Sequence, residues 1–186
     1  LLWHGSPIKR IYNMLPNNEK TNKNHFSYFL SSSEFYNSIF IESFPCRKSN
    51  MLTTGYPRND LLFQESTIMQ DIGIDGYSYS KIVIYMPTFR VSKGNENVNS
   101  KQVQSKGIIE LFNVEQRDQL DAYLSERNIL FIVKLHPSDS IAMESFENSN
   151  IKVIPNELLV SKQLQFYHLL KHADALITDY SSVFCD

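Results

Sequence analysis

Short apolar runs alternate with amphipathic segments through the second half of the chain. Four of these runs have the length of strands buried in a parallel sheet: residues 82–86, 129–133, 151–154 and 174–178. Apolar positions at helical spacing predict helices over residues 107–127 and 165–173. Strands that alternate with helices in this way are typical of a doubly wound α/β domain with right-handed crossovers. The sequence therefore predicts such a domain over residues 81–186.

The first part of the chain carries a less regular pattern. Residues 26–30 form a short apolar segment, residues 33–40 favour a helix, and residues 51–57 indicate a strand that runs into a turn. We expect residues 1–60 to be the C-terminal part of a separate, incomplete domain, and residues 61–80 to link it to the second one. The chain starts without an initiator methionine and stops where a helix has just begun, so we expect an internal fragment of a larger protein.

Composition narrows the class of protein. Hydrophobic residues make up 42% of the 186 residues and charged residues 20%, which is typical of a globular chain. A net charge of −2 argues against bulk electrostatic binding to nucleic acid. Cys46 and Cys185 lie far apart and in no metal-ligand spacing, which favours a reducing compartment such as the cytoplasm. No apolar run approaches the roughly 18 residues of a membrane span, and the first residues lack the pattern of a signal peptide.

Polar motifs follow three of the predicted strands. Pro87-Thr88-Phe89-Arg90 follows the first strand, Leu135-His136-Pro137 the second, and Asp179-Tyr180-Ser181-Ser182 the last. Ligands of open α/β sheets bind beyond the carboxyl ends of the strands. We therefore expect the three motifs to converge on one anion-binding cleft.

Ser181 and Ser182 stand between the last strand and the start of a predicted helix. Hydroxyls and backbone N–H groups at a helix N-terminus form an anion site, which suits the phosphates of a nucleotide donor. An ordinary N-cap, made by Asp179 or Ser181 and serving only the helix, stays open as the alternative.

Arg90 and His136 are candidates for phosphate contacts in that cleft. The guanidinium of Arg90 can bind a phosphate through two parallel hydrogen bonds, although a surface ion pair stays open for it. Pro137 restricts the backbone before it, and the imidazole of His136 can donate to a phosphate oxygen and stabilise a leaving group. A core histidine bonded to a carbonyl is the alternative for His136.

The segment Trp3-His4-Gly5-Ser6-Pro7-Ile8-Lys9 holds a further candidate. Because histidine titrates near neutral pH, His4 can remove a proton from a hydroxyl nucleophile, and Gly5 lets the backbone approach a ligand closely. Lys9 can hold a phosphate of the acceptor or of the donor. A purely structural role stays open for His4.

Two other features favour a structural interpretation. Gly55-Tyr56-Pro57-Arg58-Asn59-Asp60 is typical of a domain-crossing corner, with Asn59 or Asp60 as a helix cap, rather than of a catalytic segment. His168 and His172 lie four positions apart on a predicted helix, but no third metal ligand accompanies them. We interpret both histidines as surface or capping residues. No acidic cluster indicates a metal site.

In this order, the motifs resemble the CDP-glycerol glycerophosphotransferase family of bacterial teichoic-acid and capsule-polymer synthesis. The similar segments span nearly the whole chain: Trp3-His4-Gly5-Ser6-Pro7-Ile8-Lys9, Gly55-Tyr56-Pro57-Arg58-Asn59-Asp60, Tyr85-Met86-Pro87-Thr88-Phe89-Arg90, Lys134-Leu135-His136-Pro137 and Ile177-Thr178-Asp179-Tyr180-Ser181-Ser182-Val183-Phe184. The resemblance implies a GT-B architecture, in which the active site lies in the cleft between two Rossmann-like domains. Residues 1–60 would belong to the acceptor-side domain, and residues 81–186 would be the nucleotide-donor-binding domain, truncated at its C-terminus.

The resemblance also implies a reaction and the residues that perform it. The family transfers glycerol phosphate, or ribitol phosphate in close relatives, from a CDP-alcohol to a hydroxyl of a membrane-linked polymer and releases CMP. His4 and His136 would be catalytic, with His4 as the base, and Lys9 would contact a phosphate. The donor would be bound by Thr88, Arg90, Pro137, Asp179, Ser181 and Ser182. No cofactor is evident, and without an acidic cluster the sequence does not imply a tightly bound metal ion. Any contact with the inner face of the cell membrane would come from parts outside this chain.

Departures and alternatives accompany the resemblance. Relatives usually carry Thr at the position of Ser6 and Phe at that of Cys185. A GT-B glycosyltransferase that uses a nucleotide sugar would share the fold, but it would place a carboxylate near the sugar ring and would not need His4. A non-catalytic nucleotide-binding or partner-binding module is the second alternative. A nucleic-acid binder is disfavoured by the acidic balance of the chain.

Overall fold

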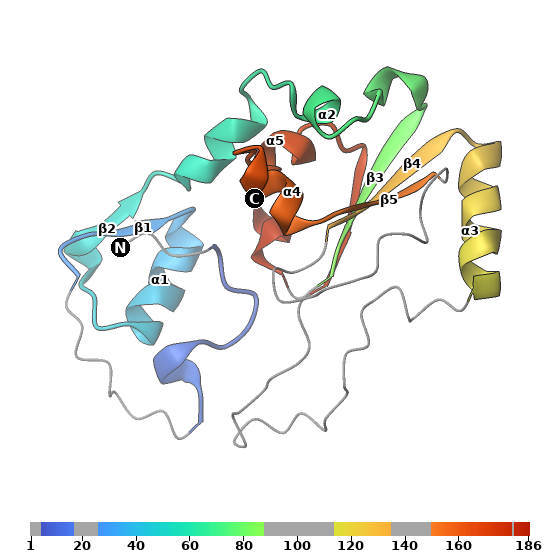
Figure 1. Cartoon of the computed structure of the whole chain (residues 1–186). Coiled ribbons are helices and arrows are strands. Elements are labelled where there is room, and N and C mark those ends of the chain that lie inside the picture. The colour runs from blue at the N-terminus through green and yellow to red at the C-terminus, as the bar shows by residue number, and fades with distance from the viewer. Residues whose placement is uncertain (1–4, 17–25, 88–113, 135–149, 180) are drawn as a thin grey trace. The chain divides into compact units, whose positions relative to one another are not determined.

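The computed structural model of the chain describes residues 5–16, 26–87, 114–134, 150–179 and 181–186. The chain divides into two compact units, one over residues 1–64 and 180–186 and the other over residues 65–179. We call them unit 1 and unit 2 and describe each by itself (Figure 1).

Unit 2 is built on a four-stranded parallel sheet. In chain order its strands are β3 (Lys81–Met86), β4 (Ile129–Lys134), β5 (Ile151–Ile154) and β6 (Ala175–Thr178). In space the order is β5-β4-β3-β6, so the chain steps away from β3 on one side and then returns to pair with its other side. This reversal is the topological switch point of a doubly wound sheet, and it lies between β3 and β6. The four predicted strands are confirmed to within one residue at each end.

Consecutive residues of β3 and β4 point to opposite sides of the sheet, and each side carries a buried apolar cluster, whereas Leu176 and Ile177 of β6 are exposed. Helices α4 (Asn156–Ser161) and α5 (Phe166–Leu170) cover one face, and α3 (Val114–Glu126) covers the other (Figure 1). The first face carries a cluster of strand and helix residues that includes Ile82, Ile84, Leu130, Ile132, Leu159 and Leu169. The cluster on the second face contains Leu124, Phe131, Val133, Ile151 and Val153.

The helices follow the sequence pattern less closely than the strands. The helix predicted over residues 107–127 is present as α3, while residues 107–113 lie outside the described residues. The helix predicted over 165–173 is the shorter α5. The pattern does not predict α2 (Ile68–Asp71), the 3-10 helix η4 (Gly76–Ser78) or α4, because each is shorter than the stretch over which helical periodicity can be recognised. Both α2 and η4 lie in the segment predicted to be a linker.

Unit 1 contains a two-stranded parallel sheet and an aromatic core. Its elements are η1 (Tyr12–Met14), β1 (Phe29–Ser31), α1 (Glu34–Ser43), η2 (Lys48–Asn50), β2 (Met51–Thr53), η3 (Pro57–Leu62) and η7 (Ser182–Cys185). Ser33 begins α1, since its side chain accepts a 3.4 Å hydrogen bond from the N–H of Tyr36. Phe29, Phe40 and Phe44 form the buried core, with the ring centroids of Phe29 and Phe40 4.6 Å apart.

The structure corrects one predicted cap. The 3-10 helix η3 begins at Pro57 with Tyr56 as its N-cap, so Asn59 and Asp60 lie inside the helix and neither of them caps it. Proline is favoured at the first helical position because the N–H group that it lacks has no partner there in any helix. The expectation of a strand running into a corner at residues 51–57 is otherwise met by β2 and the start of η3.

Candidate functional site

The carboxyl ends of β3 and β6 lie next to each other at the switch point. Met86 pairs with Thr178 in the register of the two strands, and the Thr178 hydroxyl donates a 2.6 Å hydrogen bond to the carbonyl oxygen of Met86. Buried Pro87 follows β3 directly, and half-buried Asp179 follows β6. Two of the predicted motifs therefore start at neighbouring strand ends, which is where doubly wound sheets bind their ligands.

The carboxyl end of β4 carries a buried charge. The side chain of Lys134 is 7% exposed, and its ammonium group donates to Oδ1 of Asn156 and lies 5.6 Å from the centroid of the Phe166 ring. Burial lowers the pKa of Lys134 from 10.5 to about 8, and the carboxylate of Glu157 opposes this effect in part. The strand that leads into the Leu135-His136-Pro137 motif thus ends at Lys134, whose ammonium group contacts both Asn156 and the Phe166 ring.

The predicted site residues divide between described and undescribed parts of the chain. Five of them lie outside the described residues: His4, Thr88, Arg90, His136 and Pro137. Lys9 is exposed in the loop before η1, while Ser181 and Ser182 are half-buried. The Ser181 hydroxyl accepts a 3.5 Å hydrogen bond from the N–H of Val183, so Ser181 is the N-cap of η7. This capping role is the alternative that the sequence leaves open for Ser181.

In unit 1, three segments that are far apart in the sequence meet at Gly5. The φ angle of Gly5 is +141°, and a Cβ placed on it would lie 2.3 Å from Oγ of Ser182 and 2.7 Å from Nη2 of Arg58. No real Cβ atom approaches a neighbour so closely, so this position requires glycine. The contact joins the His4-Gly5 motif to the Ser181-Ser182 motif and to the corner that contains Arg58.

Arg58 also binds the end of the Ser181-Ser182 segment. Its Nε donates to Oδ2 of Asp186 at 3.1 Å, and its Nη2 donates to Oδ1 at 2.9 Å. The side chain of Asp186 is 2% exposed and that of Arg58 is 22% exposed. The guanidinium carbon lies 4.9 Å from the centroid of the Tyr56 ring. A pair of this kind is bidentate and nearly dry, and removing one partner from such a pair costs about 3–5 kcal/mol.

Further hydrogen bonds surround this cluster. Ser6 is fully buried, with its Oγ 2.7 Å from Oγ of Ser32 and 3.2 Å from the hydroxyl of Tyr56. The hydroxyl of Tyr36 lies 3.3 Å from Sγ of Cys185. This hydrogen bond and burial raise the pKa of Tyr36 to about 12. The segment that follows β6 therefore packs against the rest of unit 1 at Ser182 and forms hydrogen bonds with it at Cys185 and Asp186.

Sequence reasoning missed Tyr36, Arg58 and Asp186. Arg58 stands in a segment that resembles the family, and this was the signal that could have identified it. Tyr36 and Asp186 lie outside any motif that points to them, and the bonds that involve them join residues 149 and 128 positions apart. Neither local periodicity nor spacing carries information about contacts at that separation.

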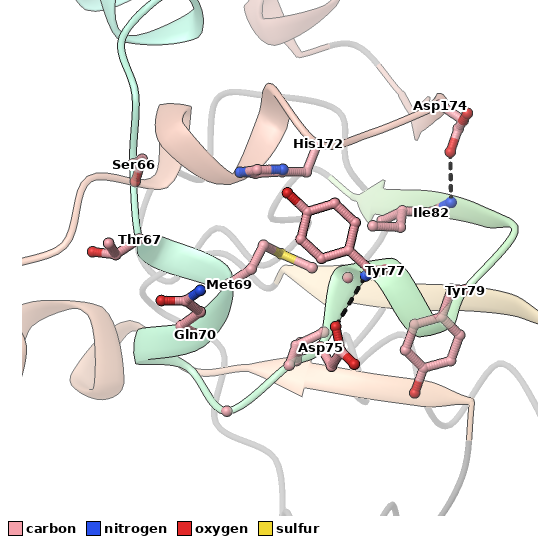
Figure 2. A pocket seen from close by; sticks show the side chains of 13 residues that line it. Ser66, Thr67, Met69, Gln70, Asp75, Tyr77, Tyr79, Ile82, His172 and Asp174 are labelled. Atoms are coloured by element: carbon pink, nitrogen blue, oxygen red, sulfur yellow. Dashed lines mark hydrogen bonds between the residues drawn. The ribbon is translucent and has the colours of Figure 1, made fainter.

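A cavity of about 600 Å³ lies at the opposite, amino-terminal end of the sheet of unit 2 (Figure 2). It is lined by residues of segment 66–82 and by His172 and Asp174, which precede β6. Among the described residues that line it, the charged ones are Asp75 and Asp174, and none is a lysine or an arginine. The dashed lines in Figure 2 mark the hydrogen bonds that these two carboxylates accept from backbone N–H groups.

The chemistry of this cavity does not suit a nucleotide diphosphate. Burial and the neighbouring Lys171 lower the pKa of His172, so its imidazole is uncharged at neutral pH. The Nε2 atoms of His168 and His172 are buried and have no hydrogen-bond partner among the described residues, while each residue as a whole is half-buried. The described lining contains two carboxylates and no lysine or arginine that could bind a phosphate, and Lys81 pairs with one of these carboxylates, that of Asp174, at 2.7 Å.

The described residues contain neither a clustered metal site nor a membrane-spanning helix. In those residues, no group of three or more histidine, cysteine, aspartate and glutamate side chains could hold a metal ion. No helix in that part of the chain has both the length and the apolar character needed to cross a bilayer. Cys46 and Cys185 are free thiols.

Residues 1–186 match the model of the CDP-glycerol:poly(glycerophosphate) glycerophosphotransferase family. The chain belongs to this family. The teichoic acid glycerol-phosphate primase of Bacillus subtilis is 32% identical over 161 residues, which cover 85% of this chain and 36% of the primase. The teichoic acid poly(glycerol phosphate) polymerase of Staphylococcus epidermidis is 26% identical over 206 residues, which cover 99% of this chain and 26% of the polymerase.

A solved structure of the wall teichoic acid polymerase TagF resembles this chain with a TM-score of 0.62 at 25% identity. The match covers 97% of this chain and 45% of TagF. The chain spans between about a quarter and a half of the length of the curated relatives that it matches first. The predicted family and the predicted α/β fold of the GT-B type are confirmed by the family match, the parallel sheets and the likeness to TagF.

Proposed function

We propose that this chain supplies the donor site of an enzyme that transfers glycerol phosphate, or a related polyol phosphate, from a CDP-alcohol to a hydroxyl of a teichoic-acid-like polymer. The observation that carries the proposal is the switch point between β3 and β6, where two family-like motifs begin at paired strand ends. The family match adds the reaction class. The lining of the cavity at the other end of the sheet, which contains two carboxylates and no lysine or arginine among the described residues, suits a diphosphate less well.

The donor contacts come from the three strand-end motifs. Arg90 and His136 bind the pyrophosphate of the donor, and Asp179 orders the loop that carries Ser181 and Ser182. Thr88 and Pro137 complete the contacts. Phosphoryl transfer needs alignment and charge stabilisation more than covalent chemistry, and cationic and hydroxyl groups supply both.

The reaction is an in-line displacement at the β-phosphorus. His4 takes the proton of the acceptor hydroxyl, whose oxygen forms the new bond to phosphorus. The bond from this phosphorus to the bridging oxygen breaks, and CMP leaves with the electron pair while His136 stabilises its charge. Lys9 contacts a phosphate of the acceptor or donor. The contact between Gly5 and Ser182 supports this assignment, since it brings the residue after His4 against a donor serine.

The acceptor is a lipid-linked polymer at the inner face of the bacterial cell membrane, and parts outside this chain make the membrane contact. CDP-glycerol and CDP-ribitol are the two donor candidates, because the curated relatives include both glycerol-phosphate and ribitol-phosphate enzymes.

The test is release of CMP by the purified full-length protein. The protein is incubated with CDP-glycerol or CDP-ribitol, with and without a lipid-linked acceptor, and CMP is quantified by chromatography. His136→Ala and His4→Ala are each expected to lower kcat by about 10²–10³-fold. Gln70→Ala, at the acidic cavity, serves as the control and leaves CMP release unchanged.

Other outcomes identify the alternatives. Turnover of a UDP- or CMP-sugar without turnover of either CDP-alcohol would show a glycosyltransferase. Binding of CDP-glycerol without any transfer would show a nucleotide-binding module. Wild-type CMP release by His4→Ala would remove His4 from the mechanism.

A further inference from the structure

The segment after β6 is fastened to the rest of unit 1 at three points. Ser182 lies against Gly5, the thiol of Cys185 is 3.3 Å from the hydroxyl of Tyr36, and Asp186 is bound by Arg58. Of these contacts, the ion pair of Arg58 and Asp186 is the most constrained in direction. Two guanidinium nitrogens address the two oxygens of one carboxylate at 2.8–3.1 Å.

Arg58 lies beside Gly5 as well as against Asp186. Its Nη2 donates to Asp186, and the same nitrogen lies 2.7 Å from where a Cβ of Gly5 would be. Ser182 Oγ lies 2.3 Å from that point. The guanidinium therefore fills the space beside the Gly5–Ser182 contact while it holds the end of the Ser182 segment.

We infer that Arg58 and Asp186 are positioning residues of the transferase site, whose ion pair fixes Ser182 against Gly5. The role in turnover rests on the proposed function, whereas the anchoring of the segment does not. Neither residue needs to touch a substrate. Both act through Ser182, which is a proposed donor contact and which their ion pair holds against Gly5.

The chemistry of the pair favours positioning over simple stabilisation. A buried ion pair adds little net stability compared with well-packed apolar residues of the same volume, because both charges must lose their water. What a planar fork on a carboxylate does provide is a fixed orientation. Lysine retains the charge of Arg58 but cannot form the fork, so Arg58→Lys separates the charge from the geometry.

The first measurement is a double-mutant cycle of CMP release from CDP-glycerol by the full-length protein. Arg58→Lys and Asp186→Asn are each expected to lower kcat/KM by about 10–100-fold, as small displacements of reacting groups do. In a Ser182→Ala background, Arg58→Lys is expected to lower kcat/KM by less than about two-fold more, because its effect passes through Ser182. A stabilising role without positioning would give additive losses.

The matched control is Glu65→Gln. This substitution breaks the ion pair of Lys171 and Glu65, in which the Glu65 side chain is fully exposed. It is expected to leave kcat/KM unchanged. Thermal melting of every variant shows which of them are folded, and if Arg58→Lys fails to fold, Asp186→Asn decides the question alone.

The second measurement is amide hydrogen exchange over residues 183–186, which needs no activity. Exchange is expected to become at least about ten-fold faster in Arg58→Lys and to stay unchanged in Glu65→Gln. Additive losses in the cycle, or wild-type kcat/KM in both Arg58→Lys and Asp186→Asn, would overturn the inference. If the wild-type protein releases no CMP from any CDP-alcohol, the proposed function fails, and unchanged exchange in Arg58→Lys would then overturn the anchoring as well.

Discussion

Gly5 and Gly73 both have a positive φ angle, and the regions around them differ in almost everything else. At Gly5, in unit 1, a Cβ would collide with Ser182 and Arg58, whereas at Gly73, on the wall of the acidic cavity in unit 2, nothing lies within 4 Å. In the first region, polar side chains pack closely and pair with one another, and we call it the closed region. The second, which we call the open region, is a cavity of about 600 Å³ that is lined in part by buried apolar side chains.

The charges of the two regions differ in the same way. Asp186 is 2% exposed and forms an ion pair with Arg58, while Asp174 at the cavity is 37% exposed and pairs with the exposed Lys81. Three of the family-like segments, those of Gly5, Arg58 and Ser182, meet in the closed region, and none of the residues that line the open one belongs to such a segment. In this molecule the described cavity and the convergence of distant polar segments therefore lie in different places.

The largest effect is expected from Gly5→Ala. The added methyl group has to displace Ser182 or Arg58, and alanine also resists the φ angle of +141°. Together these costs amount to about 2–5 kcal/mol. We expect a melting temperature lower by several degrees and CMP release below detection, measured by calorimetry and by the chromatographic assay. A stable, active Gly5→Ala protein would contradict the packing described around this turn.

The second prediction concerns Lys134, whose buried ammonium group lies at the carboxyl end of β4. Its pKa in the folded protein, about 8, lies below the value of 10.5 for a solvated lysine. Between these pH values the unfolded chain binds the additional proton, so the stability of the wild-type protein gains from rising pH in this window. Lys134→Met removes that dependence.

The expected result is that the wild-type melting temperature rises by several degrees relative to Lys134→Met between pH 8 and about 10.5. Melting curves recorded for both proteins across this range provide the measurement. Parallel curves for the two proteins would show that the amine titrates as it does in water.

Tyr36→Phe is expected to have a smaller effect within the closed region. It removes the hydrogen bond to Cys185 and lowers the free energy of unfolding by about 1 kcal/mol near neutral pH. The folded pKa of about 12 lies above the ordinary 10.0, so this contribution is complete below pH 10 and is lost as the pH rises towards 12. Absorbance titration should show one fewer late-ionising tyrosine in the variant, and an unchanged titration would contradict the assignment.

The smallest effect on turnover is expected from Gly73→Ala. The φ angle of +76° makes alanine unfavourable by about 1 kcal/mol, but no atom has to move. CMP release should stay within about two-fold of the wild-type value, since the cavity lies at the amino-terminal end of the sheet, opposite the proposed donor site. If Gly73→Ala lowered release as far as Gly5→Ala does, the cavity would belong to the active site and the comparison would fail.

The two halves of the sequence were predictable to different degrees. In unit 2 the apolar runs at residues 82–86 and 129–133 identify strands buried on both faces, because a short, continuous and β-branched apolar run is typical of the middle of a parallel sheet. The short helices α2 and α4 escaped prediction because their periodicity covers too few positions. In unit 1 the corner at Pro57 was recognised, but its cap was assigned to Asn59 or Asp60 instead of Tyr56.

The candidate site was predictable in its parts and not in its assembly. The motifs at Pro87 and Asp179 follow from local pattern, since a polar group just after a buried strand lies at the sheet edge. That β6 pairs with β3 rather than with β5 depends on the path of the whole chain, and this pairing puts side by side the two strand ends from which the motifs start.

The sequence by itself determined the family, the strands of unit 2 and the residue types available for phosphate chemistry, because motifs and periodicity are local properties of the chain. Tertiary structure alone decided that Gly5 lies against Ser182 and that Arg58 grips Asp186. A contact between residues 128 positions apart leaves no trace in spacing or composition. It arises only when folding removes both charges from water and leaves each as the other's nearest partner.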